Sequence, residues 1–597
     1  MAKRPARHEV PREQTWDLES LYPSAEAWEA DLARVDSLLP ALTAYQGRLG
    51  ESGATLLACL RLQDQLGELA MKVYWYAYNS CSVDQGNPVV QSLRGKAMAM
   101  AARAQAASAF VKPEILALPA ETVSRFLEEE PSLGLYRLYL SDILEEKEHM
   151  LGAEAEAAVA AMGELLESPY IIWQNTTAAD IAFDPVKDET GAEVPMSVAA
   201  MLRLLQSPDR SVREAAYKSA MKGFKAHKRT IAASLGAAIK RDVALAKLRR
   251  YPSSLHASLA ESHLPAELVL NLLSVSEAGA HHLQRYNEFR RRELGVDQLQ
   301  GWDLSAPLDA DVDAEITYRD ACGMILKALE PMGPEYRAIV EEAIRGRWVD
   351  YADNDGKEAG AYSWGCYGYH PIIMMTWQGK IADAFTLAHE LGHTVHSVLS
   401  ARTQPYIYSD YSLFLAEMAS TTNELLLARY LLQTTTDRKL RRYVLTRALG
   451  AFTSNFWGGS MMAALQLWMH QAVEQGESLT YESITAKQVE VFKRWYGDTV
   501  EVTPELMGGT WLRVLHHFRN FYSYQYATGI SAAAAFAEAI LTEGEPAVKR
   551  YLGFLSSGSA AHPIEILKAA GLDMTTPEPM EKAVAYFGRL VTELEKA

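Results

Sequence analysis

Two histidines and a glutamate stand at a spacing that could bind one metal ion and place a carboxylate beside it. Residues 389–393 read His-Glu-Leu-Gly-His. On a helix, His389 and His393 project from one face about one turn apart, close enough to bind the same metal ion. Glu390 lies roughly 100° round the helix, where it can reach a water on the metal rather than the metal itself. Zinc in such a site lowers the pKa of its water toward neutrality, and the glutamate accepts the proton as that water attacks a carbonyl.

The flanking residues predict that this motif lies on a helix that follows a strand. Residues 372–377 form a short apolar stretch with strand-forming residues, and the Gln-Gly pair after it marks a turn. Asp383 is expected at the helix N-cap, ahead of an apolar helical stripe in residues 384–395. In this layout a substrate peptide can lie along a sheet edge beside the metal and pair with it backbone to backbone.

A catalytic zinc site needs a third protein ligand and one open position. His396 lies on the same helical face as the motif histidines, but three stacked histidines on one straight helix would crowd the metal. The metzincin pattern is excluded, because it needs Gly and His where this chain has His396 and Leu399. Glu417 and Glu424 lie two turns apart on one face of a second predicted helix, so one can bind the metal while the other orients a ligand histidine. The helical period does not show which of these two glutamates binds the metal.

A second group of polar aromatic residues lies downstream, in residues 515–529. A zinc peptidase needs donors aimed at the oxyanion that develops on the scissile carbonyl, and histidine and tyrosine side chains can both donate. The alternative is an aromatic core helix, because aromatic stripes usually pack in cores. Paired histidines beside several tyrosines are less typical of a core, since each buried O–H and N–H needs a partner.

The chain resembles the oligoendopeptidase F family, within the larger thimet oligopeptidase and neurolysin group of zinc peptidases. Similarity extends over nearly the whole chain, and the stretches that match best are residues 360–363, 386–397 and 416–424. The resemblance implies one zinc ion per chain, bound by His389, His393 and Glu417. Glu390 would then act as general base and acid, with Glu424 in a supporting position.

The resemblance also implies roles in the downstream group. In this family a histidine followed five residues later by a tyrosine, with another tyrosine four beyond, faces the substrate. His517, Tyr522 and Tyr526 fit that spacing as catalytic residues, and His516 is the rival to His517. Gly529 stands where the thimet branch carries a further tyrosine, so no role carries over to that position.

Length and pattern predict a large helical protein. The chain has 597 residues, enough for several ordinary domains or for one large two-lobed enzyme. Long amphipathic stretches between residues 25 and 165 predict helices, and a predicted hairpin ending near residue 195 marks a soft boundary. We expect a mainly α, zincin-type two-lobed metallopeptidase with a small antiparallel or mixed β-sheet beside the zinc-binding helix. An N-terminal helical lobe is expected over residues 1–195 and the catalytic lobe over residues 196–597.

Composition and charge argue against several classes of partner. The formal net charge of −17 disfavours nucleic acid and anionic membranes as partners. The four cysteines have no paired spacing, which favours reduced thiols over a disulfide framework. The first residues lack the apolar segment of a secretory signal, and no apolar run reaches the roughly 20 residues that span a bilayer. We expect a cytoplasmic protein with oligopeptides as partners, and a homodimer stays open.

The expected function is zinc-dependent cleavage of internal bonds in short, unstructured oligopeptides. The resemblance implies a deep channel that a folded protein cannot enter. Two alternatives stay open, namely a carboxydipeptidase of the same fold and a catalytically silent peptide-binding scaffold. The intact metal-binding and acid–base residues argue against the scaffold, and the sequence contains no identifiable clamp for a terminal carboxylate, so the endopeptidase is preferred.

Overall fold

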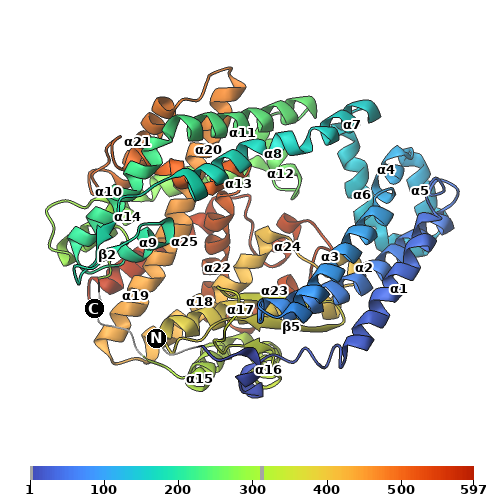
Figure 1. Ribbon diagram of the computed structural model, residues 1–597, viewed down its shortest axis with the longest axis horizontal. Helices are drawn as coiled ribbons and strands as arrows, with labels where there is room; N and C mark the ends of the chain where they lie inside the picture. The colour runs from blue at the N-terminus through green and yellow to red at the C-terminus, as the bar shows by residue number, and fades with distance from the viewer. Residues whose placement is uncertain (1–3, 309–314) are drawn as a thin grey trace. The chain divides into compact units, whose positions relative to one another are not determined.

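The computed structural model describes residues 4–308 and 315–597, most of which are helical (Figure 1). Contacts between residues group the chain into two compact units, each assembled from three stretches of sequence. Unit 1 comprises Met1–His149, Glu315–Leu427 and Ala539–Ala570, and unit 2 comprises Met150–Ala314, Ala428–Glu538 and Gly571–Ala597. The prediction of a mainly α fold with a small sheet beside the zinc-binding helix is confirmed. The contiguous lobes expected over residues 1–195 and 196–597 stay a prediction.

Three long helices open unit 1 and pack against one another (Figure 1). Each starts at a polar N-cap side chain that accepts a backbone N–H, which satisfies a donor that the first turn leaves unpaired. Shorter helices complete this part of the unit. The bounds are α1 (Ala25–Thr43), α2 (Gly53–Ser82), α3 (Pro88–Ser108), α4 (Val111–Ala117), α5 (Ala120–Glu129) and α6 (Arg137–Glu145).

A three-stranded sheet lies in unit 1 with the strand order β3-β5-β4. The central strand β5 (Tyr369–Met374) pairs parallel with β3 (Val349–Asp350) and antiparallel with β4 (Tyr362–Cys366), so the sheet is mixed and β4 is an edge strand. Gly368, with φ +75°, allows the tight turn between β4 and β5. Strand β5 ends at Met374, three residues before the end of the predicted strand. Buried tryptophans of the N-terminal segment and of α2 pack against this sheet.

The motif helix α17 (Ile381–Thr403) follows the sheet and packs on β4 and β5. Asp383 was expected at its N-cap, but the helix starts two residues earlier and Asp383 occupies its third position. From there its carboxylate accepts the backbone N–H groups of Gln378 and Lys380, which still caps the helix. The remaining helices of this unit are α15 (Tyr318–Ala328), α16 (Gly333–Arg345), α23 (Glu545–Leu555) and α24 (Pro563–Ala569). The chain passes between the units within α18 (Leu413–Thr434) and α22 (Tyr524–Glu543).

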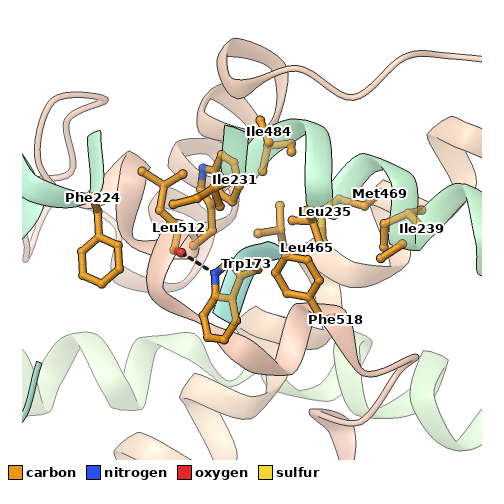
Figure 2. Close-up of a cluster of buried hydrophobic side chains, with 13 residues drawn as sticks. Trp173, Phe224, Ile231, Leu235, Ile239, Leu465, Met469, Ile484, Leu512 and Phe518 are labelled. Atoms are coloured by element: carbon orange, nitrogen blue, oxygen red, sulfur yellow. Dashed lines mark hydrogen bonds between the residues drawn. The ribbon is translucent and has the colours of Figure 1, made fainter. Parts of the chain in front are cut away.

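Unit 2 is helical apart from a short hairpin of β1 (Val186–Lys187) and β2 (Glu193–Val194). Its core includes a cluster of buried side chains from several helices, shown in Figure 2. In that cluster the indole N–H of Trp173 donates to the carbonyl of Leu512 at 3.0 Å. This hydrogen bond connects the segment before residue 516 to α8, a helix far away in the sequence. The helices are α7 (Ala153–Ala161), α8 (Gly163–Asn175), α9 (Val198–Leu204), α10 (Arg210–Ala226), α11 (Lys228–Leu248), α12 (Ser254–Ala260), α13 (Ala266–Ala278), α14 (Ala280–Glu293), α19 (Arg438–Phe452), α20 (Gly459–Glu474), α21 (Tyr481–Tyr496) and α25 (Glu578–Leu594).

Within the described part of the chain, none of the helices combines the length and the apolar character needed to cross a membrane.

Candidate metal centre

The close approach of α17 and α18 in unit 1 depends on Gly392. A Cβ atom at this position would lie 2.7 Å from the carbonyl oxygen of Ala419 and 2.7 Å from the Cα of Ser420, which is closer than real contacts allow. Asn423 fixes the register of the same pair of helices. Its amide donates to the carbonyl of Ala388 at 3.0 Å, and its oxygen accepts the hydroxyl of Tyr336 at 2.7 Å. The two helices are therefore held backbone to backbone where they carry the predicted ligands.

The structure brings His389, His393 and Glu417 together. One ligand atom from each lies within 4.8 Å of the other two. Glu417 Oε2 is 3.4 Å from His389 Nε2 and 3.7 Å from His393 Nε2. Ser420, one turn further along α18, donates its hydroxyl to Glu417 Oε2 at 2.9 Å and so helps to orient this carboxylate. The side chain of Glu417 remains 46% exposed, so solvent or a substrate can reach the group.

Glu424 and Glu390 complete the surroundings of the group. Glu424 Oε1 lies 2.8 Å from His389 Nδ1, so it can accept the ring N–H while Nε2 points to Glu417. This hydrogen bond favours the tautomer in which Nε2 is free to bind a metal. Glu390 is 6% exposed, and its Oε2 has no hydrogen-bond partner among the described residues. An oxygen buried in this way has one vacant acceptor position beside the two histidines.

The acid–base properties of the group follow from burial and from the nearby charges. Burial raises the pKa of Glu390 to about 7. Burial lowers the pKa of His393 to about 4, which keeps this ring neutral near pH 7. For Glu417 burial acts to raise the pKa, but the neighbouring His389 and His393 outweigh it and lower the pKa to about 2. His393 and Glu417 are thus in the neutral and ionised forms that bind metals. For His389 burial acts to lower the pKa, but the carboxylates of Glu417 and Glu424 outweigh it and raise the pKa to about 10, so this ring has to release a proton when a metal binds.

His396, the third histidine of α17, has a structural position. It is fully buried, with its ring stacked on Tyr411 at a centroid distance of 3.5 Å and packed against Phe554. Burial holds the pKa of His396 well below its ordinary value, so the ring is neutral. Neither ring nitrogen has a hydrogen-bond partner among the described residues. His396 therefore lies apart from the three residues that share a potential metal position.

The downstream group lies in unit 2, where His516 contacts both tyrosines. The Nε2 atom of His516 is 3.0 Å from the hydroxyl of Tyr526, and its ring stacks on Tyr522 at a centroid distance of 5.5 Å. The rings of Tyr522 and Tyr526 are themselves in edge contact at 5.6 Å. The intervening Phe521 has a φ of +47°, a strained conformation for a bulky residue, which is often a feature of functional segments.

His517 points into the interior of unit 2. It is 2% exposed, and burial lowers its pKa to about 3. The adjacent Phe518 belongs to the buried cluster of Figure 2, which explains why this part of the segment faces inward. Of the two adjacent histidines, His516 is thus the one that contacts both tyrosines.

Comparisons with known proteins identify the family. Residues 203–586 match the family described as Peptidase family M3, and residues 114–183 match one described as Oligopeptidase F. Oligopeptidase PepF of Bacillus subtilis (strain 168) is 38% identical over 592 residues, which cover 99% of this chain and 88% of that protein. This chain belongs to peptidase family M3.

Solved structures agree with the membership in family M3. A crystallised protein from Chlamydophila abortus, described as a peptidase, is 31% identical, with a TM-score of 0.94 and complete coverage of both chains. Oligoendopeptidase-F from Enterococcus faecium is 31% identical, with a TM-score of 0.73 over 96% of this chain and 98% of its own. The M3 protein described here is therefore a metal-dependent oligopeptidase.

The donor set of this M3 peptidase fits a zinc ion. Zinc is bound at about 2.0–2.1 Å by histidine nitrogen and carboxylate oxygen, so tetrahedral ligands stand about 3.3–3.5 Å apart. The two separations from Glu417, 3.4 and 3.7 Å, are close to this spacing. The second ring nitrogen of His389 already has its carboxylate partner, as histidine ligands of zinc usually do.

Sequence reasoning missed the residues of the M3 peptidase that hold the predicted metal ligands in place. Gly392 and Asn423 set the approach and register of α17 and α18, and Ser420 orients Glu417. Gly392 stands inside the motif, and the only sequence signal was a glycine in the middle of a helix, which usually has a packing reason. Asn423 and Ser420 stand in the predicted second helix without any signal of their own.

Proposed function

We propose that this chain is a zinc-dependent oligoendopeptidase in which His389, His393 and Glu417 hold one zinc ion. The observation that carries the proposal is the convergence of three ligand atoms within 4.8 Å of one another, from two helices that Gly392 brings together. Glu424 supports it as the hydrogen-bond partner of His389. A bound zinc ion would supply Lewis-acid chemistry, polarising the scissile carbonyl and making water more acidic.

Glu390 is proposed as the general base and acid. It follows His389 directly on α17, is buried, and has one oxygen without a hydrogen-bond partner among the described residues. That oxygen can accept the proton of the attacking water, and the same carboxyl can then deliver the proton to the leaving amine. Burial excludes competing solvent from the carboxyl and so favours transfer of the proton to the substrate.

The edge strand β4 offers a backbone for the substrate peptide. It packs against α17 within unit 1, and Ser363 in its middle shares a hydrogen bond of 2.9 Å with Thr394 of that helix. A peptide that pairs with an edge strand is held by main-chain hydrogen bonds, so its side chains contribute little to affinity there. This supports oligopeptides as a substrate class rather than one particular sequence.

Tyr522 and Tyr526 are proposed as donors to the oxyanion, and this role rests on the family resemblance. We assign the accompanying imidazole to His516 rather than to His517. The support is local to unit 2, since His516 contacts both tyrosines while His517 is 2% exposed. A hydroxyl bonded to an imidazole nitrogen is held in a defined orientation, as an oxyanion donor needs to be.

The cytoplasm is proposed as the place of action. The four cysteines support this, because they are buried free thiols in the described structure.

The deciding experiment is product mapping with blocked peptides. Peptides of graded lengths with acetylated N-termini, each with either an amidated or a free C-terminus, are incubated with the purified protein, and mass spectrometry locates the cleaved bonds. We expect internal cleavage that a zinc chelator stops and added zinc restores. Cleavage only of peptides with a free C-terminus, two residues from that end, would identify a carboxydipeptidase instead. A protein that binds these peptides and zinc without cleaving any of them would contradict the proposed function.

A further inference from the structure

A pocket of about 570 Å³ lies in unit 1, bounded by α2, α3, the edge strand β4, one face of α17 and the loop after α17. This volume falls within the range of about 300–1,000 Å³ that is usual for ligand pockets. Neither the metal ligands nor Glu390 line it. The pocket is thus separate from the metal group, by which we mean His389, His393 and Glu417, and the proposed chemistry does not use it.

The pocket begins one helical turn from the metal group. Ser397 lines it and follows His393 by four residues on α17, about 6 Å further along the helix axis. Ser363 also lines the pocket and is hydrogen-bonded to Thr394 of the same helix. An extended peptide advances about 3.3 Å per residue. A substrate residue only a few positions from the cleaved bond can therefore place its side chain in the pocket.

The walls of the pocket are aromatic. Trp364, Tyr367 and Tyr406 line it, and the rings of the two tyrosines are in edge contact at 5.5 Å. Tyr406 packs tightly on α2, because a Cβ at Gly67 would lie 2.8 Å from its hydroxyl oxygen. Aromatic faces carry partial negative charge and attract cations. The lining therefore favours a long side chain with a positive end over a negative one.

The charged groups of the pocket have one sign. Asp64 on α2 and Asp410 in the loop line it, and its described lining contains no lysine or arginine. Asp64 accepts the hydroxyl of Tyr136 at 2.7 Å, and neither aspartate takes part in an ion pair within the described chain. The nearby Lys72 is paired with Glu68 at 2.7 Å. Burial raises the pKa of Asp64, as expected for a carboxyl group that lacks a neighbouring cation.

We propose that this pocket binds a lysine or arginine side chain of the substrate peptide, with Asp64 as the specificity-determining residue. The inference rests on the proposed function, because it needs a peptide bound beside the metal group. The aliphatic stem of the side chain lies against the aromatic walls, and its cationic end reaches the carboxylates. A glutamate in the same place would meet two like charges and is disfavoured.

The test uses doubly blocked, internally quenched peptides that differ at one position at a time. Each position carries lysine, the uncharged norleucine or glutamate, and mass spectrometry locates the cleaved bond. We expect one position, within a few residues of that bond, at which lysine gives a higher kcat/KM than norleucine and glutamate a lower one. Asp64→Asn keeps an acceptor for Tyr136 but removes the charge. It should lower the ratio of the lysine to the norleucine kcat/KM about 10-fold, the usual weight of a hydrogen bond to a charged group.

Two further comparisons guard against a folding effect. Asp36→Asn is the matched control, because Asp36 is 40% exposed in α1, pairs with Arg103 and does not line the pocket, so the ratio should stay as in wild type. Gln105, which lines the pocket from α3, allows a charge series. Gln105→Lys should lower the preference for lysine, and Gln105→Glu should raise it.

The outcomes separate this inference from the proposed function. Wild-type cleavage of the norleucine peptides tests the proposed function by itself, and cleavage of no peptide would remove that function and the inference with it. Normal cleavage with equal kcat/KM for lysine and norleucine at every position would overturn the inference alone. A preference for lysine that Asp64→Asn and both Gln105 variants leave unchanged would also overturn it.

Discussion

The two groups of polar side chains predicted from the sequence are built in opposite ways. In unit 1 the metal group stands on two regular helices, where the helical period alone places His389 and His393 on one face. In unit 2 His516 stands on a short 3-10 turn, Tyr522 directly follows the strained Phe521, and Tyr526 stands in the first turn of α22. The residues of the first group are positioned by two regular helices, while those of the second, although closer in sequence, depend on an irregular backbone.

This difference explains which side chains the sequence alone could place on a common face. A helix positions side chains by a fixed rotation per residue, so the sequence determines the face directly. An irregular segment is positioned by whatever it packs against. Here that partner is the cluster of Figure 2, in which Trp173 and Leu512 are bonded although they lie 339 residues apart. The positions of functional side chains are therefore easier to predict on regular helices than on irregular turns.

The largest effect is expected from Glu390→Gln. The amide keeps the shape of the side chain but does not accept the proton of the attacking water, so kcat should fall by about 10²–10⁴-fold. Zinc content, measured by metal analysis of the purified variant, should stay as in wild type, because Glu390 is not among the three proposed ligands. Glu121→Gln, at an exposed position in α5, is the control. A rate near that of wild type would exclude Glu390 as the base.

A smaller effect is expected in unit 2 from Tyr526→Phe. Loss of an oxyanion donor lowers kcat by about 10²–10³-fold in comparable enzymes, and zinc content should not change. The neighbouring Tyr524 provides the matched control, because it is a buried residue of the same helix, while the ring contacts and the hydrogen bond of His516 are made with Tyr522 and Tyr526. If Tyr524→Phe and Tyr526→Phe reduced kcat equally, the assignment of a donor role to this group would be wrong.

The same two groups indicate how far sequence reasoning reaches. The motif helix, the second helix with Glu417 and Glu424, and the mainly α fold were all predictable, because each depends on local periodicity. The proposed choice of His516 over His517 was not predictable, since both residues stand in a segment that has no period. The helix start was also misplaced by two residues, because Asp383 caps α17 from its third position as well as it would from the N-cap.

Glu424 allows the metal group to be examined without changing a proposed ligand. Its carboxylate accepts the ring N–H of His389, and loss of such a partner typically lowers metal affinity by about 10–100-fold. Glu424→Ala should therefore lower zinc affinity in a competition titration with a chromophoric chelator. Glu424→Gln retains an acceptor oxygen and should have a smaller effect. Equal zinc affinity in Glu424→Ala and wild type would show that His389 does not need this partner.

The smallest effect concerns the approach of the two helices, and two glycines make it measurable. In Gly392→Ala the new methyl group would lie 2.7 Å from backbone atoms of α18, so the helices have to separate, which costs about 1–3 kcal/mol of unfolding free energy. At Gly323, in the middle of α15, an added Cβ would have no atom within 4 Å. Gly323→Ala should therefore stabilise the protein by about 0.5–1 kcal/mol, because alanine favours a helix. Thermal unfolding without zinc measures both changes. If the unfolding free energy changed with the same sign in both variants, the close approach of the two helices would be contradicted. Separation of the helices also moves Glu417 away from His389 and His393. Zinc binding should therefore weaken in Gly392→Ala and stay unchanged in Gly323→Ala.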